Sequence, residues 1–283
     1  MDRANRLDRQ DVSLGIFDTT TSGAPASCGI AFMAKASAPG CAKTRLVPPL
    51  TFEQAAALNT AFLQDAADNL LCAARLAEPN AGIAGYAAFC PRGAEEFFQR
   101  TLPREIGLID AALPNFGDCL FHTIRQILAR GHASAVVLNS DSPTLPTALL
   151  TETAAALARP GDRAVLGPSS DGGYYLLGLK TAHRCVFDDI AWSTEHVAKQ
   201  TLQRAHDIGL EIHQLPVWYD VDDVESLRRL RAELGNGATP TSRAAAHRPH
   251  YASATAALLL ELWRDDEFDD TTEAPRRVER RRA

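Results

Sequence analysis

The chain has 283 residues, of which 46% are hydrophobic and 23% are charged, and its formal net charge at pH 7 is −6. This composition excludes a collagen-like or wholly disordered chain, and the acidic balance disfavours nucleic acid as a partner. No apolar run approaches the ~18 residues that a membrane helix requires, so we expect no membrane span.

The two ends of the chain differ in composition from its centre. Residues 1–27 mix charges with Thr, Ser and Gly, and we expect a flexible N-terminal arm there. Residues 236–283 are expected to form a linker, a short helix near 251–263 and a charged, disordered tail. The first residues lack the apolar segment of a secretory signal, which favours a cytoplasmic location with the six cysteines as buried, reduced thiols.

Residues 28–235 alternate strand-like apolar runs with segments of helical period. We expect strands near 29–33, 83–89, 106–109, 135–138, 164–166, 174–179 and 211–215. We expect helices near 51–70, 94–101, 118–129, 147–157, 194–208 and 223–234, the first opened by a Thr51–Gln54 capping box. This alternation predicts a single Rossmann-like α/β domain of three layers, with a mostly parallel sheet and helices on both faces.

Ligands of open parallel sheets bind outside the carboxyl ends of the strands, so the segments after each strand are the places to look for a site. A basic loop follows the first strand, and its candidate residues for nucleotide phosphate are Lys35, Pro39, Gly40, Lys43, Thr44 and Arg45. The loop is not a Walker A motif, because Lys43 lies three residues beyond Gly40. Arg45 can fork onto two phosphate oxygens and Lys43 supplies a point charge, although solvated loop charges are the alternative.

Two carboxylates are candidate ligands of a divalent cation. Asp141 follows the central strand, and Asp222 precedes the last helix of the domain. Carboxylate oxygens suit Mg²⁺ or Mn²⁺. Each residue also has a purely structural alternative: Asp141 can end its strand in an Asx turn, and Asp222 can cap a helix in a box with Glu225.

Two further polar clusters are candidates for the reacting side of the site. Asp171, with Gly172 and Gly173, is either a catalytic carboxylate beside backbone that approaches a ligand closely or an ordinary Asp-Gly hairpin turn. The second cluster offers acceptor-side candidates, with a helix cap and a core aromatic as their alternatives; it comprises Trp192, Ser193 and Thr194. The eight histidines form no HExxH motif, and His247 and His250 lie in the C-terminal spacer, so we expect no zinc site.

The order of these motifs is more specific than any one of them. The chain reads PGCAKTRL, SDSP, DGGYYLLGL, WST and DVD in turn. Over residues 28–234 it resembles a bacterial transferase family with the nucleotide-diphospho-sugar transferase (glycosyltransferase A) fold, related to the guanylyltransferase of deazaflavin-cofactor biosynthesis. The resemblance implies that the first loop holds the nucleotide and that Asp141 and Asp222 hold the divalent ion. The chain departs from the family pattern at Asn139, where a glycine is usual, and at residues 117–121.

We therefore expect a transferase that depends on Mg²⁺ or Mn²⁺ and moves a group from a nucleotide or nucleotide-sugar donor to a small-molecule acceptor. Asp171 would orient the acceptor hydroxyl or take its proton. The first loop has a single glycine between Lys35 and Leu46, which favours a glycosyltransferase. A nucleotidyltransferase that releases pyrophosphate is the first alternative. The altered 117–121 segment leaves a non-catalytic nucleotide-binding regulator as the second.

Overall fold

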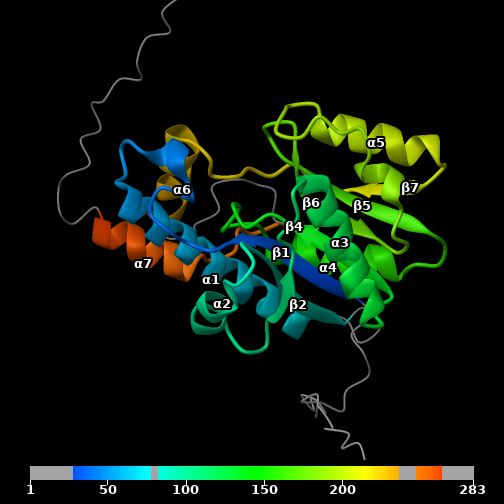
Figure 1. The fold of residues 1–283 in the computed structure, drawn as a ribbon, viewed down its shortest axis with the longest axis horizontal. Coiled ribbons are helices and arrows are strands. Elements are labelled where there is room, and N and C mark those ends of the chain that lie inside the picture. The colour runs from blue at the N-terminus through cyan, green and yellow to red at the C-terminus, as the bar shows by residue number, and fades with distance from the viewer. Residues whose placement is uncertain (1–27, 78–81, 236–246, 263–283) are drawn as a thin grey trace, which may run out of the picture.

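The computed structural model describes residues 28–77, 82–235 and 247–262, so the expected N-terminal arm and charged tail lie outside the described residues. Its strands are β1 (Cys28–Lys35), β2 (Ile83–Cys90), β3 (Gly107–Asp110), β4 (Ser134–Leu138), β5 (Arg163–Pro168), β6 (Tyr174–Leu179) and β7 (Glu211–Gln214). Its α-helices are α1 (Phe52–Leu76), α2 (Glu95–Thr101), α3 (Phe116–Ala129), α4 (Thr147–Ala158), α5 (Val197–Asp207), α6 (Val224–Gly235) and α7 (Ser253–Leu262). Figure 1 shows how they are arranged.

The strands form one sheet in the order β3-β2-β1-β4-β6-β5-β7. β6 runs antiparallel to its neighbours β4 and β5, and the other neighbouring pairs are parallel. β6 is reversed because residues 169–173 join it to β5 as a hairpin, whereas a parallel connection needs a dozen residues or more. The predicted mostly parallel α/β sheet is confirmed.

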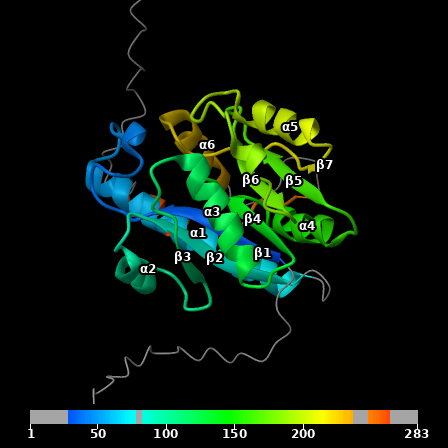
Figure 2. The same ribbon diagram turned by 45° about the vertical axis from the view of Figure 1, so that its right-hand side comes forward.

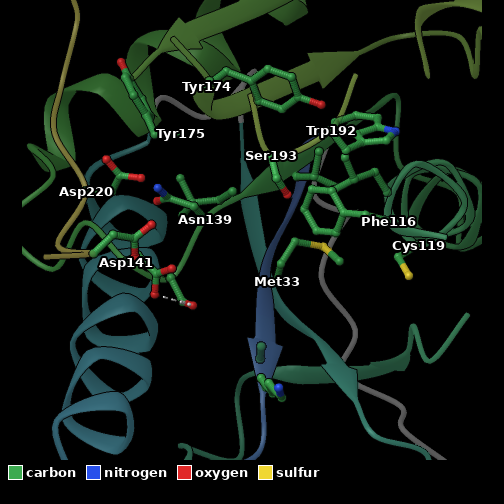
Figure 3. Close-up of a pocket in the computed structure, with 18 of the residues that line it drawn as sticks. Met33, Phe116, Cys119, Asn139, Asp141, Tyr174, Tyr175, Trp192, Ser193 and Asp220 are labelled. Carbon is green, nitrogen blue, oxygen red and sulfur yellow. Dashed lines mark hydrogen bonds between the residues drawn. The ribbon is translucent and has the colours of Figure 1, made fainter. Parts of the chain in front are cut away.

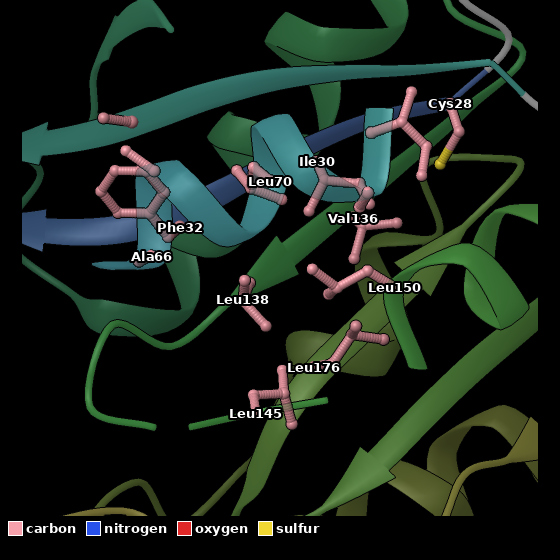
Figure 4. Packing of buried hydrophobic residues seen from close by; sticks show 14 of the residues in the cluster. Cys28, Ile30, Phe32, Ala66, Leu70, Val136, Leu138, Leu145, Leu150 and Leu176 are labelled. Carbon is pink, nitrogen blue, oxygen red and sulfur yellow. The ribbon is translucent and has the colours of Figure 1, made fainter. Parts of the chain in front are cut away.

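Helices cover both faces of the sheet, as predicted. Along β1, Ile30 and Phe32 point to the face covered by α1, α2 and α4, while Ala31 points to the face covered by α3 and α5. Figure 4 shows Ile30 close to Leu70 of α1 on the first face, and Figure 2 shows α3 lying across the second. Strands buried on both faces need continuous apolar sequence, which explains the uninterrupted runs that predicted them.

α1 is the longest helix and joins two parts of the core. The predicted capping box is present: Gln54 N donates to Thr51 Oγ1 and Thr51 N donates to Gln54 Oε1. The first half of α1 packs with α6, α7 and the segment before α6 in a separate apolar cluster that includes Phe62, Val221 and Leu259. This cluster fixes the 219–223 segment, which carries predicted site residues, against the domain.

The helix expected near 251–263 is α7, and it lies alongside α1 (Figure 1). Asp65 of α1 is 1% exposed, and its two oxygens accept the backbone N–H groups of Ala254 and Thr255 at 2.9 and 2.8 Å. A carboxylate at this position satisfies donors that the first turn of a helix leaves without intrahelical partners. Asp65 therefore anchors the start of α7 to the domain.

The cysteines are less buried than expected. All six are free thiols, but Cys28 alone is buried; Cys41 is exposed and the others are partly exposed. Cys41, Cys90 and Cys119 line a cavity described below, where loops leave strand ends uncovered.

None of the described helices combines the length and apolar character that crossing a bilayer demands.

Replacing Asp65 tests how α7 is held. We expect Asp65→Ala to lower the free energy of unfolding by about 2 to 3 kcal/mol, because two buried backbone donors lose a charged acceptor. Asp65→Asn should cost less, because one oxygen remains. Asp207→Ala is the matched control, since this exposed residue makes only surface contacts. Chemical denaturation measures all three, and equal effects of Asp65→Ala and Asp207→Ala would contradict the anchoring role.

Candidate functional site

A cavity of about 760 Å³ opens at the carboxyl ends of β1 and β4. These neighbouring strands mark the point where the strand order reverses, which is where open α/β sheets bind ligands. The volume lies within the usual range for small-molecule sites. Of the predicted site residues, those lining the cavity are Lys35, Lys43, Thr44, Arg45, Asp141, Asp171, Gly173, Trp192, Ser193, Thr194 and Asp222. Pro39, Gly40 and Gly172 are not among its lining residues.

The side chain of Lys43 joins the two predicted metal-ligating carboxylates. Its Nζ lies 2.8 Å from Asp141 Oδ1 and 3.0 Å from Asp222 Oδ1, and it also donates to the carbonyl of Val221 at 2.8 Å. The Lys43 side chain is only 5% exposed. Burial disfavours its charge, but the two carboxylates outweigh this and raise the pKa of Lys43 above its ordinary value. Lys43 is therefore a charged group, and it holds together acids that are distant in the sequence.

Backbone contacts bring the two acidic loops together independently of Lys43. Val221 N donates to the carbonyl of Asp141 at 2.8 Å, and Ser142 Oγ donates to the carbonyl of Tyr219 at 2.8 Å. The segment of residues 219–222 therefore lies along the loop that follows β4. Together with the contacts of Lys43, this pairing brings Asp141 and Asp222 close to each other.

Asp222 is not the cap of α6. The capping residue is Asp223, whose Oδ1 accepts the backbone N–H of Ser226 at 2.8 Å, while Ser226 Oγ accepts from Asp223 N at 3.1 Å. The expected box of Asp222 with Glu225 is thus displaced by one residue. Because Asp223 is the cap, the Asp222 carboxylate does not cap α6 and lines the cavity instead.

Asp220 is a cavity residue that our sequence interpretation missed. Burial, together with the charges of Asp171, Asp222 and Asp141, raises the pKa of Asp220 to about 6. The sequence contains a signal for this orientation, because alternate residues of an extended chain face opposite sides. Tyr219 and Val221 are both buried in the core. Asp220 and Asp222 therefore face the other side, which is the cavity.

Asp171 lies in a hairpin turn, as one of its two sequence interpretations predicted, and its side chain is also at the cavity. In this β5–β6 hairpin, its Oδ1 accepts the N–H of Gly173 at 2.9 Å. Gly172 has φ +94°, and a Cβ there would lie 2.2 Å from the carbonyl oxygen of Glu195. Only glycine lets the hairpin pack this closely against the 191–196 loop. Gly172 therefore determines how the hairpin and this loop are placed relative to each other.

The opposite wall of the cavity is aromatic. Trp192 makes edge-to-face contacts with Phe116 and Tyr174, at centroid distances of 5.3 and 6.5 Å, and is partly buried against the core. Figure 3 shows Phe116 and Trp192 on one side of the cavity and Asp141 and Asp220 on the other. The cavity is therefore divided into an acidic side and an aromatic side.

The loop after Trp192 differs from expectation in one respect. Ser193 does not cap the next helix, because α5 starts at Val197 and its cap position is His196. Ser193 instead has φ +64°, a left-handed conformation that few residues other than glycine adopt. Thr194 Oγ1 donates to the carbonyl of Ala191 at 2.7 Å, which closes the turn. The turn leaves Ser193 and Thr194 at the cavity.

Besides Asp220, the cavity includes other polar groups that our sequence prediction of the site residues left out, among them Asn59, Asn139 and Tyr174. Asn59 of α1 is 5% exposed and donates to the carbonyl of Lys35 and to Ser37 Oγ, so it fixes the start of the first loop. Asn139 Oδ1 and Tyr174 Oη are buried at the cavity and have no hydrogen-bond partner among the described residues. Unsatisfied buried polar atoms are costly, so these two are candidates to meet polar atoms of a ligand.

The residues of the acidic side fit a hard divalent cation. Four aspartates, Asp141, Asp171, Asp220 and Asp222, line the cavity. Lys43 pairs with Oδ1 of Asp141 and with Oδ1 of Asp222, and each carboxylate has a second oxygen that a cation can bind. Oxygen donors with excess negative charge are what Mg²⁺ and Mn²⁺ require.

Comparisons with known proteins support the resemblance drawn from the motifs. Residues 77–194 match a family model described as "Uncharacterized protein conserved in bacteria (DUF2064)". No curated protein matches the chain. Among solved structures, the chain is 28% identical to a "putative nucleotide-diphospho-sugar transferase" from Desulfovibrio desulfuricans G20, with a TM-score of 0.71, covering 86% of this chain and 96% of that one. The nucleotide-diphospho-sugar transferase fold is thereby confirmed.

Two more distant structures match over most of their length. One is CMP:2-keto-3-deoxy-manno-octonic acid synthetase complexed with CTP, at 13% identity and TM-score 0.47, covering 75% of this chain and 100% of that one. The other is a cytidylyltransferase from Leptospira borgpetersenii serovar Hardjo-bovis, at 10% identity and TM-score 0.46, covering 88% and 100%.

The raised pKa of Asp220 predicts a pH-dependent stability for the metal-free protein. The folded state holds a proton on Asp220 up to about pH 6, whereas the ordinary pKa of the group is 3.8, so folding loses stability as the pH rises through this interval. Asp220→Asn removes the penalty. After allowance for solvent screening we expect it to raise the free energy of unfolding by about 1 kcal/mol at pH 7.5 and by nearly nothing at pH 4.

Thermal unfolding in the presence of a chelator, at several pH values, measures this difference. Asp223→Asn is a suitable control, because asparagine also caps helices and the charge change is the same. A stabilisation by Asp220→Asn that does not vary with pH would refute the assignment.

Proposed function

We propose that this chain is a metal-dependent transferase that takes a nucleotide-activated donor, and that it transfers a glycosyl group from a nucleotide sugar. The observation that carries the proposal is the convergence of Asp141 and Asp222 around Lys43 in a cavity at the point of strand-order reversal. The similarity to the Desulfovibrio protein supports the same class of reaction.

The basic residues of the first loop bind the donor phosphates in this proposal. Arg45 is exposed at the cavity, and its guanidinium can form two parallel bonds to phosphate oxygens. Lys35 ends β1 at the same cavity and adds a point charge. Lys43 is already bound to two carboxylates, so in this proposal its first role is to hold Asp141 and Asp222 in position.

Asp141 and Asp222 would hold the divalent cation, Mg²⁺ or Mn²⁺. When bound, the ion neutralises the negative charge that develops on the diphosphate as its bond to the sugar breaks. Asp220 lies beside this pair, and its charge adds to the field that attracts a cation.

Asp171 would act on the acceptor. In the transfer, the bond between the sugar carbon and the diphosphate oxygen breaks, and a bond from the acceptor oxygen to that carbon forms. The proton of the acceptor hydroxyl passes to Asp171, which requires an approach within about 3 Å. Trp192, Ser193 and Thr194 border the same cavity, and the Trp192 ring offers a flat surface for a sugar or a base.

Substituting the two carboxylates tests the metal role. We expect Asp141→Asn or Asp222→Asn to lower the turnover rate by about 10² to 10³, because each removes a preorganised charge at the diphosphate. Metal-dependent nucleotide binding, measured by calorimetry with and without chelator, should weaken in parallel. Asp223→Asn is the matched control, because the adjacent Asp223 caps α6. Unchanged metal-dependent binding in both variants would refute the role.

The donor class is settled by following products. We expect incubation with Mg²⁺ or Mn²⁺ and a panel of nucleotide sugars to release a nucleoside diphosphate, detected by mass spectrometry. Depletion of a nucleoside triphosphate with release of pyrophosphate would instead establish a nucleotidyltransferase. A ligand-induced thermal shift without any product, from either panel, would indicate a nucleotide-binding regulator and overturn the proposed catalysis.

A further inference from the structure

A second group of potential metal ligands lies away from the cavity, on the second half of α1. Asp68 and Cys72 are four residues apart, so they share one face of the helix, and His250 of the segment before α7 meets them there. One donor atom from each lies within 4.8 Å of the other two. None of the three residues lines the cavity. Along α1, Asp68 is about 14 Å from the cavity residue Asn59.

The Nε2 atom of His250 faces this cluster and has no hydrogen-bond partner among the described residues. The His250 side chain is 7% exposed and its Nε2 is buried, although Asp68 Oδ2 lies 3.4 Å away. A buried ring nitrogen without a partner carries a cost that a bound ligand would relieve. This is an observation independent of the acidic and thiol groups, and it points to the same place.

The remaining contacts of His250 favour the tautomer that a metal needs. Its Nδ1 lies 3.5 Å from Thr147 Oγ1, and the hydroxyl hydrogen of Thr147 is already donated to Asn69 Oδ1 at 2.7 Å. Thr147 Oγ1 can therefore only accept from Nδ1, which places the ring hydrogen there. The lone pair is then on Nε2, facing the cluster, as in metal sites where the second nitrogen of a histidine is held by the protein.

The spacing and the donor types suit Zn²⁺. A tetrahedral zinc ion with bonds of about 2.0 to 2.3 Å has its ligand atoms about 3.3 to 3.8 Å apart. Asp68 Oδ2 lies 3.4 Å from His250 Nε2 and 3.9 Å from Cys72 Sγ, so small side-chain rotations would close the site. Arg75 donates to Cys72 Sγ at 3.0 Å, so the sulfur already accepts a hydrogen bond at this position. Asp68 is half exposed, which leaves a way in from solvent.

We propose that Asp68, Cys72 and His250 form a zinc site, with water as the fourth ligand, that fastens the segment before α7 to α1. The site offers a borderline-soft ion one nitrogen and one sulfur ligand beside the oxygen of Asp68, whereas the cavity offers a hard ion carboxylate oxygens. Because it joins two segments far apart in the chain, its occupancy stabilises the fold and does not take part in the transfer reaction.

Direct metal titration of the full chain tests the proposal. We expect the chelator-treated protein to bind one Zn²⁺ with high affinity in the presence of excess Mg²⁺, measured by competition with a chromophoric chelator. At a free Zn²⁺ concentration 100-fold above the dissociation constant, the Tm should rise by about 5 to 10 °C. Co²⁺ in place of Zn²⁺ should give the near-ultraviolet charge-transfer absorption of a thiolate ligand.

Paired variants decide which residues bind. Cys72→Ser should abolish the thiolate absorption and His250→Ala should weaken Zn²⁺ binding by more than about 100-fold, whereas Cys185→Ser and His247→Ala should leave both unchanged. Absence of tight Zn²⁺ binding by the unmodified chain, or equal binding by Cys72→Ser and Cys185→Ser, would overturn the proposal. If a variant folds poorly, the Co²⁺ spectrum of the unmodified chain still decides the proposal. Failure of the zinc site would leave the proposed transferase untouched, because none of these residues belongs to the cavity.

Discussion

The arrangement of the candidate site depends on one buried ammonium group. Lys43 Nζ is surrounded by Asp141, Asp222 and the carbonyl of Val221, and its side chain is almost wholly shielded from water. A buried charge without partners is prohibitively costly, so the first loop, the loop after β4 and the segment before α6 must meet at this point. The left-handed backbone of Lys43 itself, with φ 52°, fits a position that its surroundings determine. Three separate parts of the chain are thereby brought to one edge of the sheet.

The fold supplies the place where these segments meet. β1 and β4 are adjacent in the sheet although two strands lie between them in the sequence, and the crevice above their carboxyl ends receives loops from both sides. The reversed strand β6 adds the hairpin that carries Asp171, and Gly172 lets this hairpin pack against the loop of Trp192. The cavity thus acquires its acidic and its aromatic sides from different elements (Figure 3).

α7 shows how residues beyond the sheet become part of the same structure. Asp65 of α1 accepts the first backbone N–H groups of α7, and the cluster of Asp68, Cys72 and His250 lies one turn further along the same helix. α1 therefore contacts the cavity through Asn59 and holds α7 through Asp65. The histidine spacing in the sequence could not have indicated this cluster, because its members come from two segments that only packing brings together.

The sequence by itself determined the elements and the fold class, because apolar period, capping pairs and turn glycines are local and act within a few residues. The basic loop, Asp141, Asp171 and Asp222 were recognisable in the same way, since each follows or precedes a predicted strand or helix. Only the tertiary structure decided that Asp141 and Asp222 share Lys43 as a partner, that Asp223 and not Asp222 caps α6, and that Asp220 is buried near three other carboxylates. These features depend on distances between segments and on burial, and both arise only when the loops are packed against one another.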